Sequence, residues 1–263
     1  MRMSDMLVSL LTQPLWVFVA VLARISPPLM LAPPTRSAAV PMRIRALIAI
    51  AAGLLLTPMA MPTAGPMPGD LLNLGLALAV EALLGLLLGS IMLMAISCLQ
   101  IAGQTAGHLA GFDMATAVDP GSNEEMPVVS NMLGWLAMAI LLIIGGHRQL
   151  LDCCLESFTR YPVGQIVVED SWFHEIEYVL RFTFVIAIRA AAPLGIALLL
   201  ANLVTGLLAR TLPQLNVLAI GFNINALALL MLLFVTVGSI SYVFQAELST
   251  WVGTCQRIVG ADP

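Results

Sequence analysis

Lysine is absent from the 263-residue sequence, and charged side chains of any kind are scarce. Charged residues make up 10% of the chain and hydrophobic residues 60%, whereas a soluble globular domain has about 25% and about 45–50%, respectively. The mean hydropathy is +0.97. We therefore expect an integral membrane protein. Without lysine, the chain can form neither a lysine Schiff base nor a P-loop.

The charge that is present excludes a further class of protein. All 11 basic residues are arginines, and 15 acidic residues outnumber them, which gives a formal net charge of −4. A nucleic-acid-binding protein needs a clustered basic face. The sequence therefore predicts no nucleic-acid partner.

The sequence also lacks the spacings that metal sites and catalytic centres require. No CxxC pair, zinc motif or GxSxG turn occurs. His147 and Arg148 follow Gly145 and Gly146, and we interpret them as the positively charged cap at the end of a helix. The cysteines are interpreted as small apolar residues: Cys98, Cys153, Cys154 and Cys255. The sequence predicts a non-enzymatic protein with no cofactor and no metal.

Apolar stretches predict an all-α fold of membrane-type helical hairpins. There are six of them: residues 7–23, 44–61, 71–99, 128–145, 176–201 and 217–245. A bilayer core requires roughly 20 apolar residues, so the first, second and fourth stretches are short. The third would measure about 44 Å as one helix. Such uneven lengths predict that some helices are tilted, broken or projecting. No hydrophilic domain interrupts the chain, so residues 1–263 are expected to form one integral domain with a retained N-terminal anchor.

Proline-rich connections separate the first three stretches and predict stiff turns. The prolines are Pro27, Pro28, Pro33, Pro34 and Pro41 in the first connection, and Pro58, Pro62, Pro66 and Pro68 in the second. The first connection carries Arg24, Arg36, Arg43 and Arg45, which favours the cytoplasmic side. The third connection, 100–127, should lie on that side too, yet it contains no arginine. Some apolar segments are therefore expected not to cross the bilayer in the usual way.

Glu81 lies deep in the third stretch and shares a helical face with Gly85 and Gly89. The GxxxG step lets another backbone approach closely, and a carboxylate there needs a donor. Glu81 could be an ion or proton site, or a structural polar contact between helices or subunits, and we favour the contact. Arg181 and Arg189 of the fifth stretch suggest either a substrate path or interchain ion pairs.

Two further patterns predict protein-facing helix surfaces. Gly103, Gly107 and Gly111 recur at every fourth residue, which predicts a close-packing ridge. The residues after it, 112–123, are too polar for lipid and too apolar for an ordinary loop, so they are expected to line or block a cavity or to form an extramembrane turn. A small and polar stripe follows near the C-terminus: Asn202, Thr205, Gly206, Ala209 and Arg210.

Three ordered blocks of residues give the sequence a family resemblance over nearly its whole length. They are Gly103 to Pro120; Gly146-His147 with Ser157-Phe158 and Tyr161 to Gly164; and Pro193, Gly206, Arg210 and Pro213 to Phe222. The chain resembles the flagellar biosynthesis protein R family and its injectisome relatives, the single-copy subunit of the type III protein-export gate. It departs from that family's pattern at Asn223 and Asn225, where Pro and Lys are often found, and at Leu109 and Ala110.

The resemblance implies that helical hairpins co-assemble with the P and Q subunits into a ring of helical symmetry. It implies contacts with the B and A subunits and with unfolded export substrates. The N-terminal part would be P-like, and the part from about residue 176 Q-like. The implied location is the bacterial cytoplasmic membrane at the flagellar basal body. The family's pore plug corresponds to Gly111, Phe112, Met114, Val118, Asp119 and Pro120. Helix and subunit packing is expected at Glu81, Gly85, Gly89, Gly103, Gly107, Asn202, Gly206, Arg210, Pro213, Gln214 and Asn216.

The sequence thus predicts a core subunit of the flagellar type III export gate that forms part of the pore and its plug. The flagellar branch is favoured by the residues from Leu212 to Phe222. Two alternatives stay open at this point. One is the equivalent injectisome subunit, and the other is a small-solute transporter that uses Glu81, Arg181 and Arg189.

Overall fold

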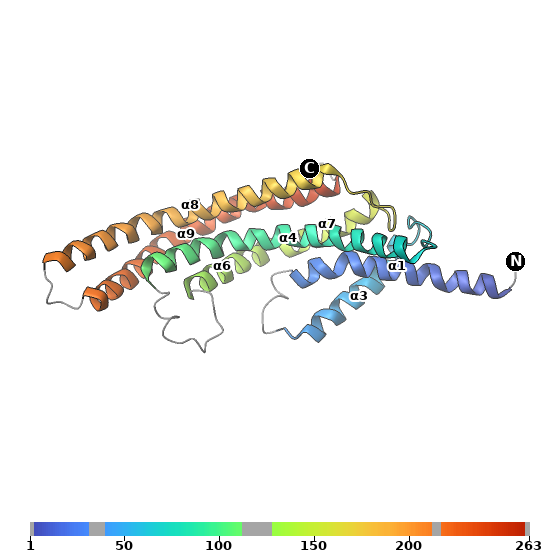
Figure 1. Cartoon of the computed structure of the whole chain (residues 1–263), viewed down its shortest axis with the longest axis horizontal. Helices are drawn as coiled ribbons and strands as arrows, with labels where there is room; N and C mark the ends of the chain where they lie inside the picture. The colour runs from blue at the N-terminus through green and yellow to red at the C-terminus, as the bar shows by residue number, and fades with distance from the viewer. Residues whose placement is uncertain (1–2, 32–39, 112–127, 212–216, 261–263) are drawn as a thin grey trace. The chain divides into compact units, whose positions relative to one another are not determined.

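The described part of the chain consists of α-helices and contains no strand, which confirms the predicted all-α class. The computed structural model describes residues 3–31, 40–111, 128–211 and 217–260. Its helices, drawn in Figure 1, are α1 (Met3–Leu31), α3 (Met42–Ala60), α4 (Leu71–Ala110), α6 (Val128–Ile144), α7 (Gly146–Arg160), α8 (Asp170–Thr211) and α9 (Val217–Val259). Each of the six predicted apolar stretches forms a helix.

Several of these helices are suited to a bilayer by length and composition. Five have spans that are long and apolar enough: Thr12–Leu31, Met42–Ala60, Leu71–Ala110, Asp170–Leu208 and Gly221–Val259. A sixth span results if α6 and α7, which meet at an angle of 65°, are counted as one broken span. α4, α8 and α9 have 40, 42 and 43 residues. At 1.5 Å per residue each would measure roughly 60 Å, about twice the hydrocarbon thickness, so these helices can project well beyond a bilayer.

Three prolines assigned to the connections lie inside helices, so that prediction was wrong. Pro27 and Pro28 belong to α1, and Pro58 belongs to α3. A proline removes the N–H that would bond to the carbonyl four residues earlier, and near a helix end few such bonds remain to be lost. The first connection therefore starts after Leu31. Arg24 does not belong to it either, because it lies in α1 with 1% of its surface exposed.

The described contacts divide the chain into two compact units that interleave along the sequence. The first contains 1–93, 145–179 and 249–263, and the second contains 94–144 and 180–248. A division near residue 176 into P-like and Q-like parts is not tested by these contacts and stays a prediction.

The first unit has a core built on one face of α1. Buried residues of α1 pack with residues of α3, α7 and the segment after α7: Trp16, Val17, Ala20, Val21, Ile25, Ala60, Phe158 and Val163. In the second unit, the C-terminal part of α4 packs on α6, where the Ser130 hydroxyl donates to the Gln100 carbonyl at 2.8 Å. Contacts between helices thus supply most of the first unit's core and the packing of α4 on α6 in the second.

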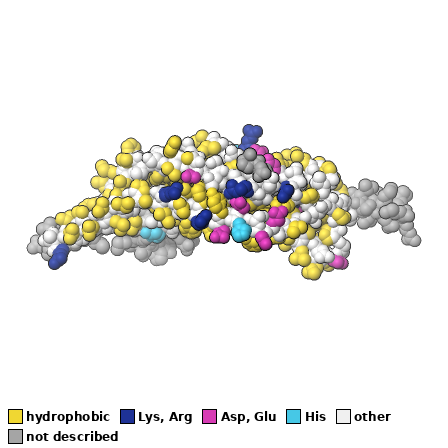
Figure 2. All heavy atoms as spheres, turned by 90° about the horizontal axis from the view of Figure 1, so that it is seen from above, with side chains coloured by type: hydrophobic (Ala, Val, Ile, Leu, Met, Phe, Trp, Pro, Cys, Tyr) yellow, Lys and Arg dark blue, Asp and Glu magenta, His cyan; other side chains and the backbone are white. Residues whose placement is uncertain are grey.

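Large apolar side chains also remain on the outside of the described helices. Examples are Leu55, Leu71, Ile143 and Phe234, which are 75–89% exposed. Figure 2 shows hydrophobic side chains over much of the visible face, with few charged ones between them. Apolar surface of this extent requires lipid or protein partners.

Candidate functional site

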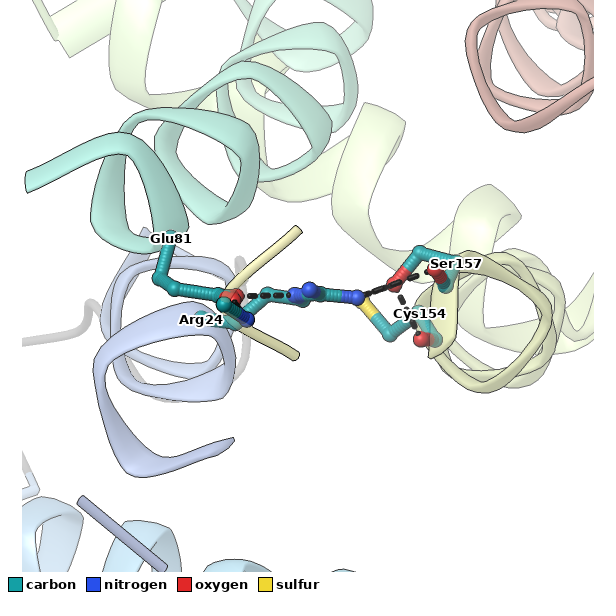
Figure 3. A network of polar contacts seen from close by, with 5 residues as sticks. Arg24, Glu81, Cys154 and Ser157 are labelled. Carbon is teal, nitrogen blue, oxygen red and sulfur yellow. Dashed lines mark hydrogen bonds and ion pairs between the residues drawn. The ribbon is translucent and has the colours of Figure 1, made fainter. Parts of the chain in front are cut away.

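A buried ion pair links α1 to α4 in the first unit. The Nε of Arg24 donates to the Oε2 of Glu81 at 2.6 Å, and the two side chains are 1% and 0% exposed. Figure 3 shows the two side chains pointing toward each other from their helices. A charge this deeply buried is tolerated when it is paired and hydrogen-bonded. Both conditions hold for the Nε and Nη1 of Arg24, whereas its Nη2 has no hydrogen-bond partner among the described residues.

The ion pair is extended by α7 and by the turn that follows it. The Nη1 of Arg24 donates to the Ser157 carbonyl at 2.9 Å and to the Ser157 hydroxyl at 3.3 Å, and the guanidinium lies 4.3 Å from the centre of the Phe158 ring. The second carboxylate oxygen of Glu81 accepts the backbone N–H of Gly164 at 2.9 Å. Three regions far apart in the sequence, α1, α4 and α7 with the turn after it, therefore meet at one pair of charges.

Gly164 can supply that N–H because of its backbone conformation. Its φ is +76°, in the left-handed region that favours glycine. A Cβ at this position would also lie 3.1 Å from the Trp16 ring. The turn Tyr161–Gly164, singled out in the sequence for its resemblance to the family, thus directs a backbone donor at Glu81.

Gly85 and Gly89 lie one and two turns beyond Glu81 and contact α1. A Cβ on Gly85 would overlap with the carbonyl oxygen of Arg24, and a Cβ on Gly89 would lie 2.8 Å from the Cα of Pro28. Pro28 has no N–H to donate to the Arg24 carbonyl, so this carbonyl lacks its usual partner in the helix. The missing proline donor and the missing glycine side chain together let the two backbones touch.

Arg24 is the functional residue that the sequence interpretation missed. It was assigned to a connection, where an arginine reports on topology. Its spacing indicates a buried position instead, because Arg24 lies on the same helical face of α1 as the buried Val17 and Val21. Glu81 is held within this chain. A role for it between subunits stays a prediction.

In the second unit, two of the three ridge glycines are buried. A Cβ on Gly103 would lie 2.7 Å from the Cα of Ser130 in α6, and Gly107 is buried too. Gly111 does not continue the ridge. It has a φ of +83° and follows the last residue of α4, where a left-handed glycine ends the helix.

Asn202 and Asn225 form a hydrogen-bonded chain to the end of α4. The Nδ2 of Asn202 donates to the Leu109 carbonyl at 2.9 Å, and the Nδ2 of Asn225 donates to the Oδ1 of Asn202 at 2.5 Å. The Thr205 hydroxyl donates to the Asn202 carbonyl at 3.0 Å. Gly206 and Arg210 of the same predicted stripe are exposed in this chain, and their packing against another subunit stays a prediction.

Several predicted site residues lie outside the described residues. For the plug these are Phe112, Met114, Val118, Asp119 and Pro120, and for the packing site they are Pro213, Gln214 and Asn216. Their roles stay predictions.

The residues of the transporter alternative are divided between the two units, with Glu81 in the first and Arg181 and Arg189 in the second. Both carboxylate oxygens of Glu81 are engaged by Arg24 and Gly164. Arg181 and Arg189 are exposed on α8. Arg257 of α9 binds Glu175 at 3.0 Å.

The cap assigned to His147 and Arg148 was wrong. Gly145, with a φ of +83°, ends α6 and lets the chain bend, so both residues lie in the first turn of α7. A helix N-terminus carries the positive end of the dipole, so neither residue can stabilise it as the predicted cap would. The four cysteines are buried free thiols.

Comparison with known proteins assigns a family. The model of the bacterial export proteins, family 1, matches residues 15–251. The chain is 30% identical over 182 residues to the flagellar biosynthetic protein FliR of Bacillus subtilis, which covers 68% of this chain and 70% of that protein. It is 27% identical over 230 residues to the FliR of Caulobacter vibrioides, covering 87% and 91% of the two chains. It is also 28% identical over 182 residues to the Yop proteins translocation protein T of Yersinia pestis, covering 68% and 70%. The chain therefore belongs to the bacterial export proteins, family 1.

Proposed function

We propose that this chain is a core subunit of the flagellar type III protein-export gate, a non-enzymatic protein of the bacterial cytoplasmic membrane at the flagellar basal body. The observation that carries the proposal is the family match over residues 15–251, together with the flagellar biosynthetic proteins among the similar chains. The long apolar helices support a membrane location.

The partners of the chain are the P and Q subunits, with which it forms a ring, and the B and A subunits of the export apparatus. The exposed apolar residues of the long helices support such contacts, because they offer more apolar surface than a monomer in water would expose. The ring passes unfolded export substrates. Its closed state excludes water and ions.

The plug of this pore is formed by Gly111, Phe112, Met114, Val118, Asp119 and Pro120. The support from the described residues is the position of Gly111 at the end of α4, where its left-handed backbone ends the helix and the chain leaves it. Apolar side chains such as Phe112 and Met114 fill the closed pore without offering hydrogen bonds to water. They must move aside for a substrate.

Shortening the chain within 112–120 tests the plug. We expect the variant to assemble with its partner subunits but to make the membrane several-fold more permeable to ions, because the apolar side chains that fill the closed pore are removed. Ion conductance is measured in cells that express the complete gate, and assembly is measured by co-purification.

The matched control for this deletion replaces Glu124 and Glu125 with glutamine. These residues lie in the same connection but outside the proposed plug, so conductance should stay at the wild-type level. Unchanged conductance in an assembled deletion variant would overturn the plug assignment.

The similarity to the translocation protein of Yersinia pestis supports a second candidate, the equivalent injectisome subunit. The two candidates differ in what the intact export apparatus carries. Isolation of the assembled complex with its attached filament parts distinguishes them, since hook proteins support the flagellar proposal and needle proteins support the injectisome.

A further inference from the structure

The backbone carbonyls in the last turn of α4 need hydrogen-bond donors from outside the helix. The last four carbonyls of an α-helix lack donors within the helix, and Leu109 is next to last in α4. The neighbouring His108 carbonyl accepts the N–H of Gly111 at 3.1 Å. The Leu109 carbonyl instead receives a side-chain donor, the Nδ2 of Asn202 on α8.

The direction of each hydrogen bond in this chain of groups is fixed by chemistry. A carbonyl only accepts, so Asn202 must present its NH2 group to Leu109 and its oxygen to the other side. Asn225 must then present its own NH2 group to that oxygen. An aspartate at either position would place an oxygen where a donor is required.

Because the side chain of Asn225 is buried, these hydrogen bonds can hold the end of α4 in a fixed position. Asn225 is 7% exposed, and within the described ranges its Oδ1 has no hydrogen-bond partner. α8 also contacts the Leu109 side chain, because a Cβ on Gly195 would lie 3.5 Å from its Cδ1. Leu109 is thus held through both its side chain and its carbonyl.

We propose that Asn202 and Asn225 are positioning residues that clamp the last turn of α4 to α8 and α9, so that the chain leaves α4 at a fixed point. This inference rests on the proposed function, since the proposed plug begins at Gly111, directly after α4. Asn225 stands in the stretch where the family resemblance expects Pro and Lys, so this clamp uses a residue by which the sequence departs from that pattern.

Two isosteric variants in the complete gate test the clamp. Asn202→Asp removes the donor to Leu109, and Asn225→Asp places a second acceptor against Asn202. We expect amide hydrogen exchange in residues 105–111 to rise by roughly 2- to 10-fold, the range that corresponds to the net contribution of one hydrogen bond. We also expect ion conductance to rise while co-purification with the partner subunits is unchanged.

The matched control is Asn223→Asp, which makes the same chemical change at an exposed position on α9, the helix that carries Asn225. It should change neither the exchange nor the conductance. If the two clamp residues act as one unit, the double variant will be no more affected than the more affected single variant.

The outcomes separate the clamp from the proposed function. Unchanged exchange at residues 105–111 in Asn202→Asp would overturn the clamp. So would a rise in exchange that Asn223→Asp matches. Faster exchange there, combined with unchanged conductance after deletion within 112–120, would support the clamp and overturn the plug. If Asn202→Asp does not assemble, Asn202→Ser, which keeps a shorter donor, should recover assembly and show faster exchange; slow exchange in that variant would overturn the clamp.

Discussion

A Glu81→Leu variant is expected to fail to accumulate as a folded protein. The substitution leaves the Arg24 guanidinium buried without its counter-ion, at a position where α1, α4 and α7 meet. Removal of one partner from a buried pair costs about 3–5 kcal/mol, which is a large part of the roughly 5–15 kcal/mol that stabilises a folded domain. The measurement is the yield of the co-purified complex and its thermal stability in detergent.

The double variant Arg24→Met/Glu81→Leu should be much less affected than the single one. Replacing both charges with apolar side chains of similar volume removes the unpaired charge, and such replacements are often neutral in other proteins. Some loss will remain, because the Gly164 N–H loses its partner and the Ser157 carbonyl keeps only the N–H of Tyr161.

An exposed ion pair provides the control for this experiment. Arg257 and Glu175 are 3.0 Å apart, but their side chains are 42% and 23% exposed. A pair of this kind contributes about 0–1 kcal/mol, so Glu175→Leu should have a small effect. If Glu81→Leu is no more harmful than Glu175→Leu, the buried pair does not hold these helices together.

The second large effect is expected from Gly85→Ala. The added Cβ would overlap with the Arg24 carbonyl, which is backbone and cannot rotate away, so α1 and α4 must separate. Overpacking usually costs about 1–3 kcal/mol, and this contact with backbone places Gly85→Ala at about 3 kcal/mol or above. Thermal unfolding of the purified complex measures the change.

Gly75→Ala is the matched control, because it makes the same substitution in the same helix but is expected not to lower the stability. Gly75 is exposed and has no atom within 4 Å of an added Cβ. Alanine in a helix is favoured over glycine by about 0.5–1 kcal/mol, so this variant should be neutral or slightly more stable. Equal stability of the two variants would show that the α1–α4 contact is not as close as described.

The helices were predictable from the sequence because the signal for them is local. Each apolar stretch is long enough to be recognised by composition, and each forms a helix. The ends were less predictable. The third predicted stretch ends at Leu99, but α4 continues to Ala110. Protein contacts support this extension, among them the bond from Ser130 to the Gln100 carbonyl.

Of the buried ion pair, the sequence predicted the carboxylate but not its partner. Glu81 could be recognised as a carboxylate in need of a donor, because it stands alone in an apolar run. Its partner lies 57 positions away in the sequence, and no local periodicity connects the two. The Asn225–Asn202 bond spans 23 positions, and the bond from Asn202 to Leu109 spans 93, so neither was visible from spacing.

The interleaved first unit has a consequence for biosynthesis. Its last segment, 249–263, belongs with the N-terminal helices, and the Tyr161 hydroxyl donates to the Ile258 carbonyl at 3.1 Å. On the ribosome, α1 emerges more than two hundred residues before that carbonyl has been made, as the printed sequence shows. The first unit therefore reaches its complete packing only after the segment 249–263 has been made, long after its N-terminal helices have left the ribosome.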